Sequence, residues 1–209
     1  TLEELSAAVH EAKRAGRKVP AHAHGTSGMK NAIRAGVHSI EHATLMDEEA
    51  AGLFEKHAVY MVPTLSALAT TGACRRGCGI ADDALEKAKA MTKRHQSSFR
   101  QAHQRGLLIA MGTDAGTPFN YHGDNAQELE RMVAYGMSPM EAILTSTSAA
   151  ARLIGIDDQV GTIEPGKQAD IVLIEGNPLK KINLLRDRRR IVGVMKAGQF
   201  VSGAFLQAH

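Results

Sequence analysis

The strongest constraint on the fold is an alternation of short apolar segments with helical patterns in the first part of the chain. The segments that indicate strands cover residues 18–22, 37–42, 58–62 and 107–112, and helical spacing marks residues 1–16, 25–35, 47–57 and 81–105. Strands joined by helical crossovers run parallel, and a parallel sheet needs helices on its faces. The alternation therefore predicts an α/β fold.

The pattern changes near residue 155. Helical spacing continues over residues 125–135, 139–146 and 148–154, and then short apolar strands without crossovers follow at 170–174, 191–196 and 199–201. Strands joined by turns instead of crossovers pair antiparallel. We therefore expect two domains, residues 1–155 and 156–209, and we expect part of a small antiparallel sheet domain in the second.

Composition indicates a globular protein and excludes two classes of partner. Hydrophobic residues make up 44% of the chain and charged residues 22%, which are ordinary values for a packed domain. No apolar stretch approaches the roughly 20 residues that a membrane span needs. The net charge is +3, and the basic cluster over residues 180–190 lacks interleaved aromatic side chains that could stack on bases. We expect neither nucleic acid nor a membrane as partner, and we expect a cytoplasmic location.

Cys74 and Cys78 stand four positions apart, with no second pair of Cys or His at zinc-finger spacing. A structural zinc site is therefore not expected there. A local disulfide is one alternative, and two free loop thiols are the other. Because nothing else in the chain indicates an oxidising compartment, we favour the free thiols.

Side chains that ligate metals lie where the predicted strands end. His22 closes the first strand, His42 closes the second, and Asp114 follows the fourth. In a parallel β/α barrel the carboxyl ends of the strands meet at one face, where reacting groups sit. Imidazole and carboxylate suit Zn²⁺, and an open position on the metal can hold water. One such histidine would indicate little, but three matches in order predict a metal site.

Asp114 is also the candidate general base. Water bound to zinc loses its proton near neutral pH. A carboxylate that contacts both metal and water can accept this proton and return it to a leaving amine.

The remaining polar residues near predicted strands receive no catalytic role. Tyr60 and Thr64 flank Met-Val-Pro on the third strand, where a role in a pocket is one alternative and core packing is the favoured one. The other histidines lie within predicted helices, open a strand or end the chain: His10, His38, His57, His95, His103 and His209.

Four motifs resemble those of the amidohydrolase superfamily. They are His-Ala-His-Gly, Gly-Val-His-Ser-Ile-Glu-His, Gly-Thr-Asp-Ala-Gly-Thr-Pro and Gly-Thr-Ile-Glu-Pro-Gly-Lys-Gln-Ala-Asp-Ile-Val. The last motif is the most specific, and the resemblance extends over essentially the whole chain. More narrowly, the chain resembles the branch that contains imidazolonepropionase-like enzymes and metal-dependent dipeptidases of the Xaa-Pro and Xaa-Arg/Lys type.

This resemblance implies both a fold and a set of site residues. The fold would be the C-terminal half of a TIM barrel, with strands five to eight, followed by part of a small β-sandwich domain. His22 and His42 would bind one or two divalent metals, such as Zn²⁺, from strands five and six, and Asp114 would act as ligand and base after strand eight. His24 and His122 would contact the substrate. Strand alternation supports His24, because it faces the same way as His22.

Two features of the superfamily have no counterpart in this chain. They are the His-x-His pair after the first strand and the bridging lysine after the fourth, and both would precede Thr1. We therefore expect a C-terminal part that is completed by the N-terminal half of the same enzyme or by association into a homo-oligomer. Half a barrel leaves open sheet edges and exposed apolar surface, so we expect the isolated chain to be poorly stable and inactive.

The leading functional hypothesis is metal-dependent hydrolysis of an amide or peptide-like C–N bond in a small molecule or dipeptide. A noncatalytic fragment, or a metal-binding or assembly module, is the alternative from a different class. Deamination or cyclic-imide hydrolysis is a further alternative, because one fold and one metal site can serve several reactions.

Overall fold

The computed structural model describes residues 1–74 and 77–203. Its contacts form two compact units, Thr1–Gly123 and Asp124–His209, and each unit is described by itself. This grouping places the helices after residue 124 with the C-terminal strands. It does not test the domain boundary predicted near residue 155, which stays a prediction.

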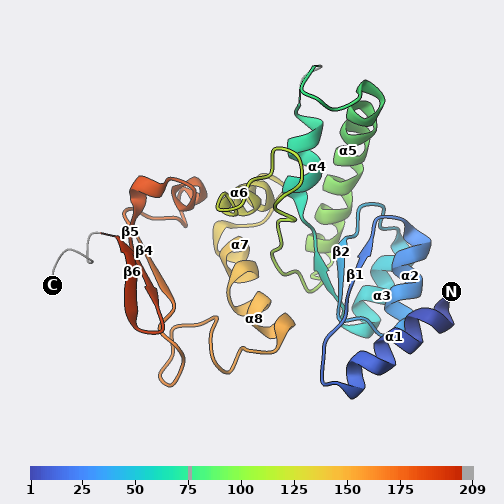
Figure 1. The fold of residues 1–209 in the computed structure, drawn as a ribbon, viewed down its shortest axis with the longest axis horizontal. Helices are drawn as coiled ribbons and strands as arrows, with labels where there is room; N and C mark the ends of the chain where they lie inside the picture. The colour runs from blue at the N-terminus through green and yellow to red at the C-terminus, as the bar shows by residue number, and fades with distance from the viewer. Residues whose placement is uncertain (75–76, 204–209) are drawn as a thin grey trace. The chain divides into compact units, whose positions relative to one another are not determined.

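A parallel three-stranded sheet organises the first unit (Figure 1). Its strands are β1 (Pro20–Ala23), β2 (Ser39–His42) and β3 (Tyr60–Val62), and β2 lies between the other two. Helices α2 (Thr26–Ala35) and α3 (Glu48–His57) are the crossovers, and α1 (Leu2–Arg14) precedes β1. The predicted parallel α/β organisation is thus confirmed for these strands.

The fourth predicted strand, residues 107–112, forms only one bridge to the sheet. Ile109 is bridged in parallel to Met61, and the Met61 amide donates to the Leu108 carbonyl at 2.8 Å. β3 ends at Val62, and the next residue is Pro63, which has no N–H to extend the ladder. The barrel strand expected here is therefore present only as a short extended segment.

The core of this unit lies between the sheet and the two crossover helices. Met29 and Ile33 on α2, Phe54 on α3, Ile40 on β2 and Met61 on β3 are each at most 1% exposed. Met29 and Ile33 stand four apart, so they lie on one face of α2. Burial of such side chains, worth roughly 1.5–3 kcal/mol each, holds the helices against the strands and fixes where the strands end.

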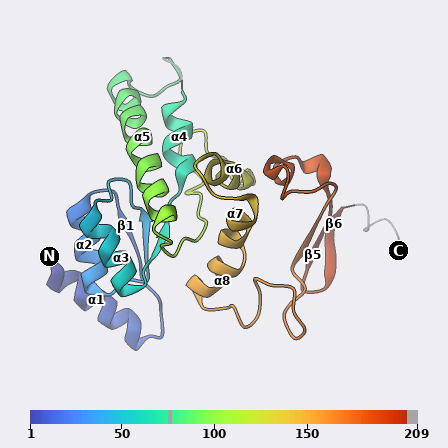
Figure 2. The same cartoon turned by 180° about the vertical axis from the view of Figure 1, so that it is seen from behind.

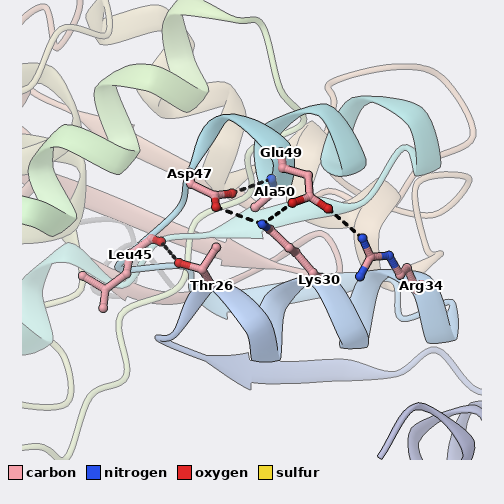
Figure 3. A network of polar contacts seen from close by, with 7 residues as sticks. All are labelled: Thr26, Lys30, Arg34, Leu45, Asp47, Glu49 and Ala50. Atoms are coloured by element: carbon pink, nitrogen blue, oxygen red, sulfur yellow. Dashed lines mark hydrogen bonds and ion pairs between the residues drawn. The ribbon is translucent and has the colours of Figure 1, made fainter.

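A polar network ties α2 to the start of α3 (Figure 3). The Lys30 ammonium group lies 2.9 Å from Asp47 and 2.5 Å from Glu49. Arg34 lies 2.7 Å from the other oxygen of Glu49. Asp47 is also the N-cap of α3, since its carboxylate accepts the Ala50 amide at 2.8 Å. Exposed ion pairs add little stability, so the cap is the larger contribution of Asp47.

Helices α4 (Leu65–Gly72) and α5 (Asp82–Gln104) lie side by side in both views (Figures 1 and 2). The long helix α5 was predicted, but α4 was not. Its sequence, Leu-Ser-Ala-Leu-Ala-Thr-Thr-Gly, lacks charges and a clear polar face, so tertiary packing decides its conformation. The prediction of free thiols was wrong: Cys74 and Cys78 form a disulfide, and their Cα atoms lie 6.4 Å apart, within the range that a disulfide spans.

The described residues of the second unit, 124–203, form three α-helices and an antiparallel sheet. The helices are α6 (Ala126–Ala134), α7 (Pro139–Ser146) and α8 (Ser148–Ile154), and the strands are β4 (Ile171–Ile174), β5 (Ile191–Lys196) and β6 (Gln199–Gly203). Two short 3₁₀ helices, η1 (Ile182–Leu185) and η2 (Arg188–Arg190), join β4 to β5. The predicted antiparallel sheet is confirmed, whereas a sandwich partner for it stays a prediction.

The basic cluster near residue 186 is partly neutralised within this unit. Arg186 contacts Asp124 at 2.6 Å and Glu130 at 3.2 Å. Arg190 contacts Glu175 at 2.7 Å. These pairs agree with an interpretation of the cluster as protein surface. Over residues 1–74 and 77–203, no helix has the length and apolar character needed to cross a membrane.

Candidate active site

His22 and His42 meet at the carboxyl end of the parallel sheet. The Nδ1 atom of His22 lies 2.8 Å from Nε2 of His42. The two residues come from neighbouring strands in parallel register, where His22 is opposite Glu41 and Ala23 is opposite His42. The strand pairing therefore brings two ring nitrogens from distant parts of the sequence to one point.

His24 joins this pair from the segment after β1. Its ring stacks on His42 with centroids 4.4 Å apart and an angle of 6° between the planes. Burial lowers the pKa of His24, and the neighbouring charge of His22 adds to this effect. Burial also lowers the pKa of His42 to about 4. Both rings are therefore neutral at pH 7, the form in which imidazole binds metals.

Threonine hydroxyls hold both of these rings by their Nδ1 atoms. Thr64 Oγ1 lies 2.7 Å from Nδ1 of His42, and Thr44 Oγ1 lies 2.8 Å from Nδ1 of His24. When Nδ1 carries the proton and donates it to the hydroxyl, Nε2 keeps its lone pair for a ligand. The interpretation of Thr64 as packing alone was therefore incomplete, because residue type and strand position do not show what a hydroxyl contacts.

Asp114 contributes negative charge near the histidines. Its charge raises the pKa of His42 and of His24, against the larger effect of burial. It also raises the pKa of Glu41, for which burial is the main cause. Asp114 and His42, both predicted as ligands, therefore lie within electrostatic range of each other.

Glu41 was missed by the sequence reasoning. Its carboxylate accepts the Ser39 hydroxyl at 2.6 Å, and the nearby charge of His22 lowers its pKa against the effect of burial. An acidic residue inside a predicted strand was the available signal, since carboxylates are seldom buried without a partner. It places a second acidic side chain beside His22.

Left-handed backbone conformations cluster at the ends of three successive extended segments. The φ angle is 75° at His42, 50° at Thr64 and 51° at Asp114. Non-glycine residues seldom adopt this region, and each such residue costs on the order of 1–3 kcal/mol. Strain of this kind concentrates where side chains must be aimed at a ligand. Left-handed backbone is thus present at three of the residues that the side-chain chemistry indicates.

Helix α5 fastens the turn that carries His42. His95, which is 2% exposed, donates from Nε2 to the His42 carbonyl at 2.8 Å. Ser98 Oγ donates to the Thr44 carbonyl at 2.8 Å. His95 had been given no role, because a helical pattern locates a residue on its helix without showing what that helix covers. The structure places it directly against the site.

Two further histidines differ in their surroundings. His38, expected away from the site, accepts the Val19 amide at Nδ1, 3.0 Å away, which is a local structural contact. His122 lies over Gly116, where its Nε2 is 3.3 Å from the position of an added Cβ. Its predicted contact with substrate stays a prediction.

The donor set is chemically suited to a metal such as zinc. Two nitrogens bound to one tetrahedral zinc lie about 3.3 Å apart, given bonds of about 2.0–2.1 Å, so His22 and His42 would need to separate by only about half an ångström. Over the part of the chain that the structure describes, no three His, Cys, Asp or Glu side chains converge as a complete ligand group. The set of His22, His42 and Asp114 stays a prediction.

A family model, described as "Amidohydrolase family", matches residues 1–201. The chain belongs to the amidohydrolase family. The resemblance of its motifs to that superfamily is thereby confirmed, and the family is generally metal-dependent.

Individual relatives connect this amidohydrolase chain to enzymes that cleave C–N bonds. Ochratoxinase from Aspergillus niger is 34% identical over 203 residues, which is 96% of this chain and 41% of that protein. A solved Xaa-Pro dipeptidase with methionine bound in its active site is 40% identical, with a TM-score of 0.89, covering 97% of this chain and 49% of that one. A putative prolidase from Bifidobacterium longum is 36% identical, with a TM-score of 0.89, covering 96% and 51%.

The chain spans about half the length of these relatives. The activities named for them belong to proteins about twice as long. Membership in the family supports hydrolysis of C–N bonds. The substrate, and the dependence of activity on other segments, are matters for proposal.

Proposed function

We propose that this chain forms part of a metal-dependent amidohydrolase that cleaves an amide or peptide-like C–N bond by means of activated water. The observation that carries the proposal is the convergence of His22 Nδ1 and His42 Nε2 at 2.8 Å, within electrostatic range of Asp114. Two imidazoles and a carboxylate at the carboxyl ends of parallel strands are suited to hold a hydrolytic metal.

In this proposal each residue has a separate task. His22, His42 and Asp114 hold one or two divalent metals, and Zn²⁺ when bound supplies acidified water and a polarised carbonyl. Asp114 accepts the proton from the attacking water and returns it to the departing amine. Thr64 keeps the proton of His42 on Nδ1, so that Nε2 points to the metal.

The proposed substrates are dipeptides and related small amides. Support comes from the dipeptidase and ochratoxinase relatives. His24, stacked on His42, and His122, in the loop after Asp114, are proposed to contact the substrate. An imidazole nitrogen can donate or accept a hydrogen bond, according to which nitrogen carries the proton, and can therefore contact an amide or carboxyl group of such a molecule.

We further propose that hydrolysis needs protein beyond the present chain, from an N-terminal half or from a partner in an oligomer. The relatives are about twice as long. A noncatalytic metal-binding role is the second candidate, since the described residues hold no complete group of three metal ligands. Deamination or cyclic-imide hydrolysis would use the same residues on other substrates.

Zinc content and hydrolysis measured together test the proposal. The chain is assayed alone and joined to the segment encoded in frame upstream of Thr1, with Xaa-Pro dipeptides, N-acyl phenylalanines, a cyclic imide and an aminopurine. Asp114→Asn should abolish hydrolysis, while His10→Gln on exposed α1 should not. Zinc binding without turnover of any substrate would favour the noncatalytic module. Hydrolysis that persists in Asp114→Asn would overturn the proposed base.

A further inference from the structure

The loop that follows Asp114 is built around the side chain of Asn120. This residue is 1% exposed, whereas its neighbours Phe119 and Tyr121 are 40% and 68% exposed. The chain thus turns the polar residue inward and the aromatic residues outward, which reverses the usual preference. Burying an amide is unfavourable unless hydrogen bonds replace those to water.

Those hydrogen bonds go to the backbone that carries Asp114. The Nδ2 group of Asn120 donates to the Thr113 carbonyl at 2.6 Å and to the Asp114 carbonyl at 3.0 Å. It also lies 3.3 Å from Thr117 Oγ1, and this hydroxyl donates to the Asp114 carbonyl at 3.0 Å. The two carbonyls on either side of the Asp114 Cα atom are therefore both held by one side-chain amide.

Backbone hydrogen bonds close the same loop. The Gly116 amide donates to the Asn120 carbonyl at 2.8 Å, and the Asn120 amide donates to the Thr117 carbonyl at 3.0 Å. Asp114 itself has a φ of 51°, a conformation that a non-glycine residue holds only when its surroundings impose it. The contacts of Asn120 supply this constraint on both flanking carbonyls.

We propose that Asn120 is a positioning residue for Asp114, which fixes the left-handed backbone from which the carboxylate projects. The inference rests on the proposed function, in which Asp114 is ligand and base. Without the amide, Asp114 relaxes toward an ordinary backbone conformation, and its carboxylate turns away from His42. Loss of such a supporting contact typically costs about 10–100-fold in metal affinity or activity.

The test compares three variants of the loop. Asn120→Ala removes the amide, and Asn120→Asp keeps the shape but replaces the donor with a carboxylate that faces carbonyl oxygens. Thr117→Val removes the second donor to the Asp114 carbonyl. Asn177→Ala is the control, since the side-chain oxygen of Asn177 accepts a local amide, that of Leu179, in the other unit. Zinc affinity is measured by competition with a chromophoric chelator, in the form of the protein that binds zinc.

Combination with Asp114→Asn separates positioning from general destabilisation. We expect Asn120→Ala and Asn120→Asp to weaken zinc binding by about 10–100-fold, and to cause no further loss once Asp114 is already Asn. Amide hydrogen exchange at Gly116 should also be faster in both variants. The inference would be overturned if the Asn120 substitutions reduced zinc affinity equally with and without the Asp114 carboxylate. Unchanged amide hydrogen exchange at Gly116 would also overturn it.

The outcomes distinguish this inference from the proposed function. Zinc binding that depends on Asn120, without hydrolysis of any amide, would reject the proposed function and leave the positioning role standing. Hydrolysis of dipeptides that is unaffected by Asn120→Ala would support the proposed function and reject the positioning role of Asn120. A wild-type protein that binds no zinc and hydrolyses nothing would overturn both.

Discussion

The buried imidazole of His95 should make the stability of the protein depend on pH in a predictable way. Burial lowers the pKa of His95 to about 4 from its ordinary value of 6.5, and the hydrogen bond to the His42 carbonyl opposes this shift only in part. Between these two pH values the unfolded chain binds a proton at His95 and the folded chain does not. The stabilisation that depends on neutral His95 is therefore present in full above pH 6.5, and it is lost as the pH falls toward 4.

The size of the effect follows from the two pKa values. Linkage of one proton with these constants gives a loss of about 2 kcal/mol between pH 7.5 and pH 5. At pH 5 the folded protein still holds His95 almost entirely neutral, so this figure depends mainly on the pKa in the unfolded chain. A loss of this size is a large fraction of the stability of an ordinary domain.

The substitution that tests this reasoning is His95→Gln, whose amide can still donate to the His42 carbonyl but does not titrate. Urea unfolding at pH 7.5 and pH 5 gives the free energy of unfolding of each protein. From pH 7.5 to pH 5, the free energy of unfolding of the wild type should fall by about 2 kcal/mol more than that of the variant. Other histidines contribute equally to both proteins. His10→Gln, on exposed α1, controls for removal of an imidazole. Parallel losses in wild type and His95→Gln would refute the reasoning.

Three further substitutions test the site and its supports. Gly112→Ala should destabilise the protein by about 1–3 kcal/mol in urea unfolding, because the new Cβ would collide with Cγ1 of Val62, a side chain with few rotamers. Thr64→Val should weaken zinc binding by about 10–100-fold, measured by chelator competition, since it leaves Nδ1 of His42 without the hydroxyl. Asp47→Ala should cost about 1 kcal/mol of unfolding free energy, whereas Asp47→Asn keeps the cap and should cost less.

Matched controls accompany these substitutions. Gly52→Ala lies within α3, and beyond the adjoining residues and the helix backbone no atom lies within 4 Å of the new Cβ, so it should stabilise by roughly 0.5–1 kcal/mol. Thr71→Val removes a hydroxyl that donates to the Ala67 carbonyl within α4, and it should leave zinc affinity unchanged. A neutral Gly112→Ala, an unchanged affinity in Thr64→Val, or equal losses in the two Asp47 variants would contradict the respective reasoning.

Local patterns in the chain predicted most of its elements. Helical spacing over residues 1–16 located α1, which the structure shows to begin with a capping box of Thr1 and Glu4, and short apolar runs between helices located the parallel strands. The helix α4 was missed because its short sequence, without charges or a clear polar face, carries no periodic signal. The single bridge at Ile109, in place of a full strand, depends on how far β3 extends before Pro63, which no pattern within residues 107–112 reveals.

The candidate ligands His22, His42 and Asp114 could be named from the chain alone. The periodicity of strands and helices locates the strand ends, and these residues are the metal-binding side chains found there. The residues that hold these ligands in place could not be identified in this way. The hydroxyl of Thr64, the imidazole of His95 and the amide of Asn120 acquire their partners only when segments far apart along the chain, or turns with left-handed backbone, are brought together. Periodicity specifies which way a residue faces within its own element, whereas hydrogen-bond partners depend on the packing of one element against another.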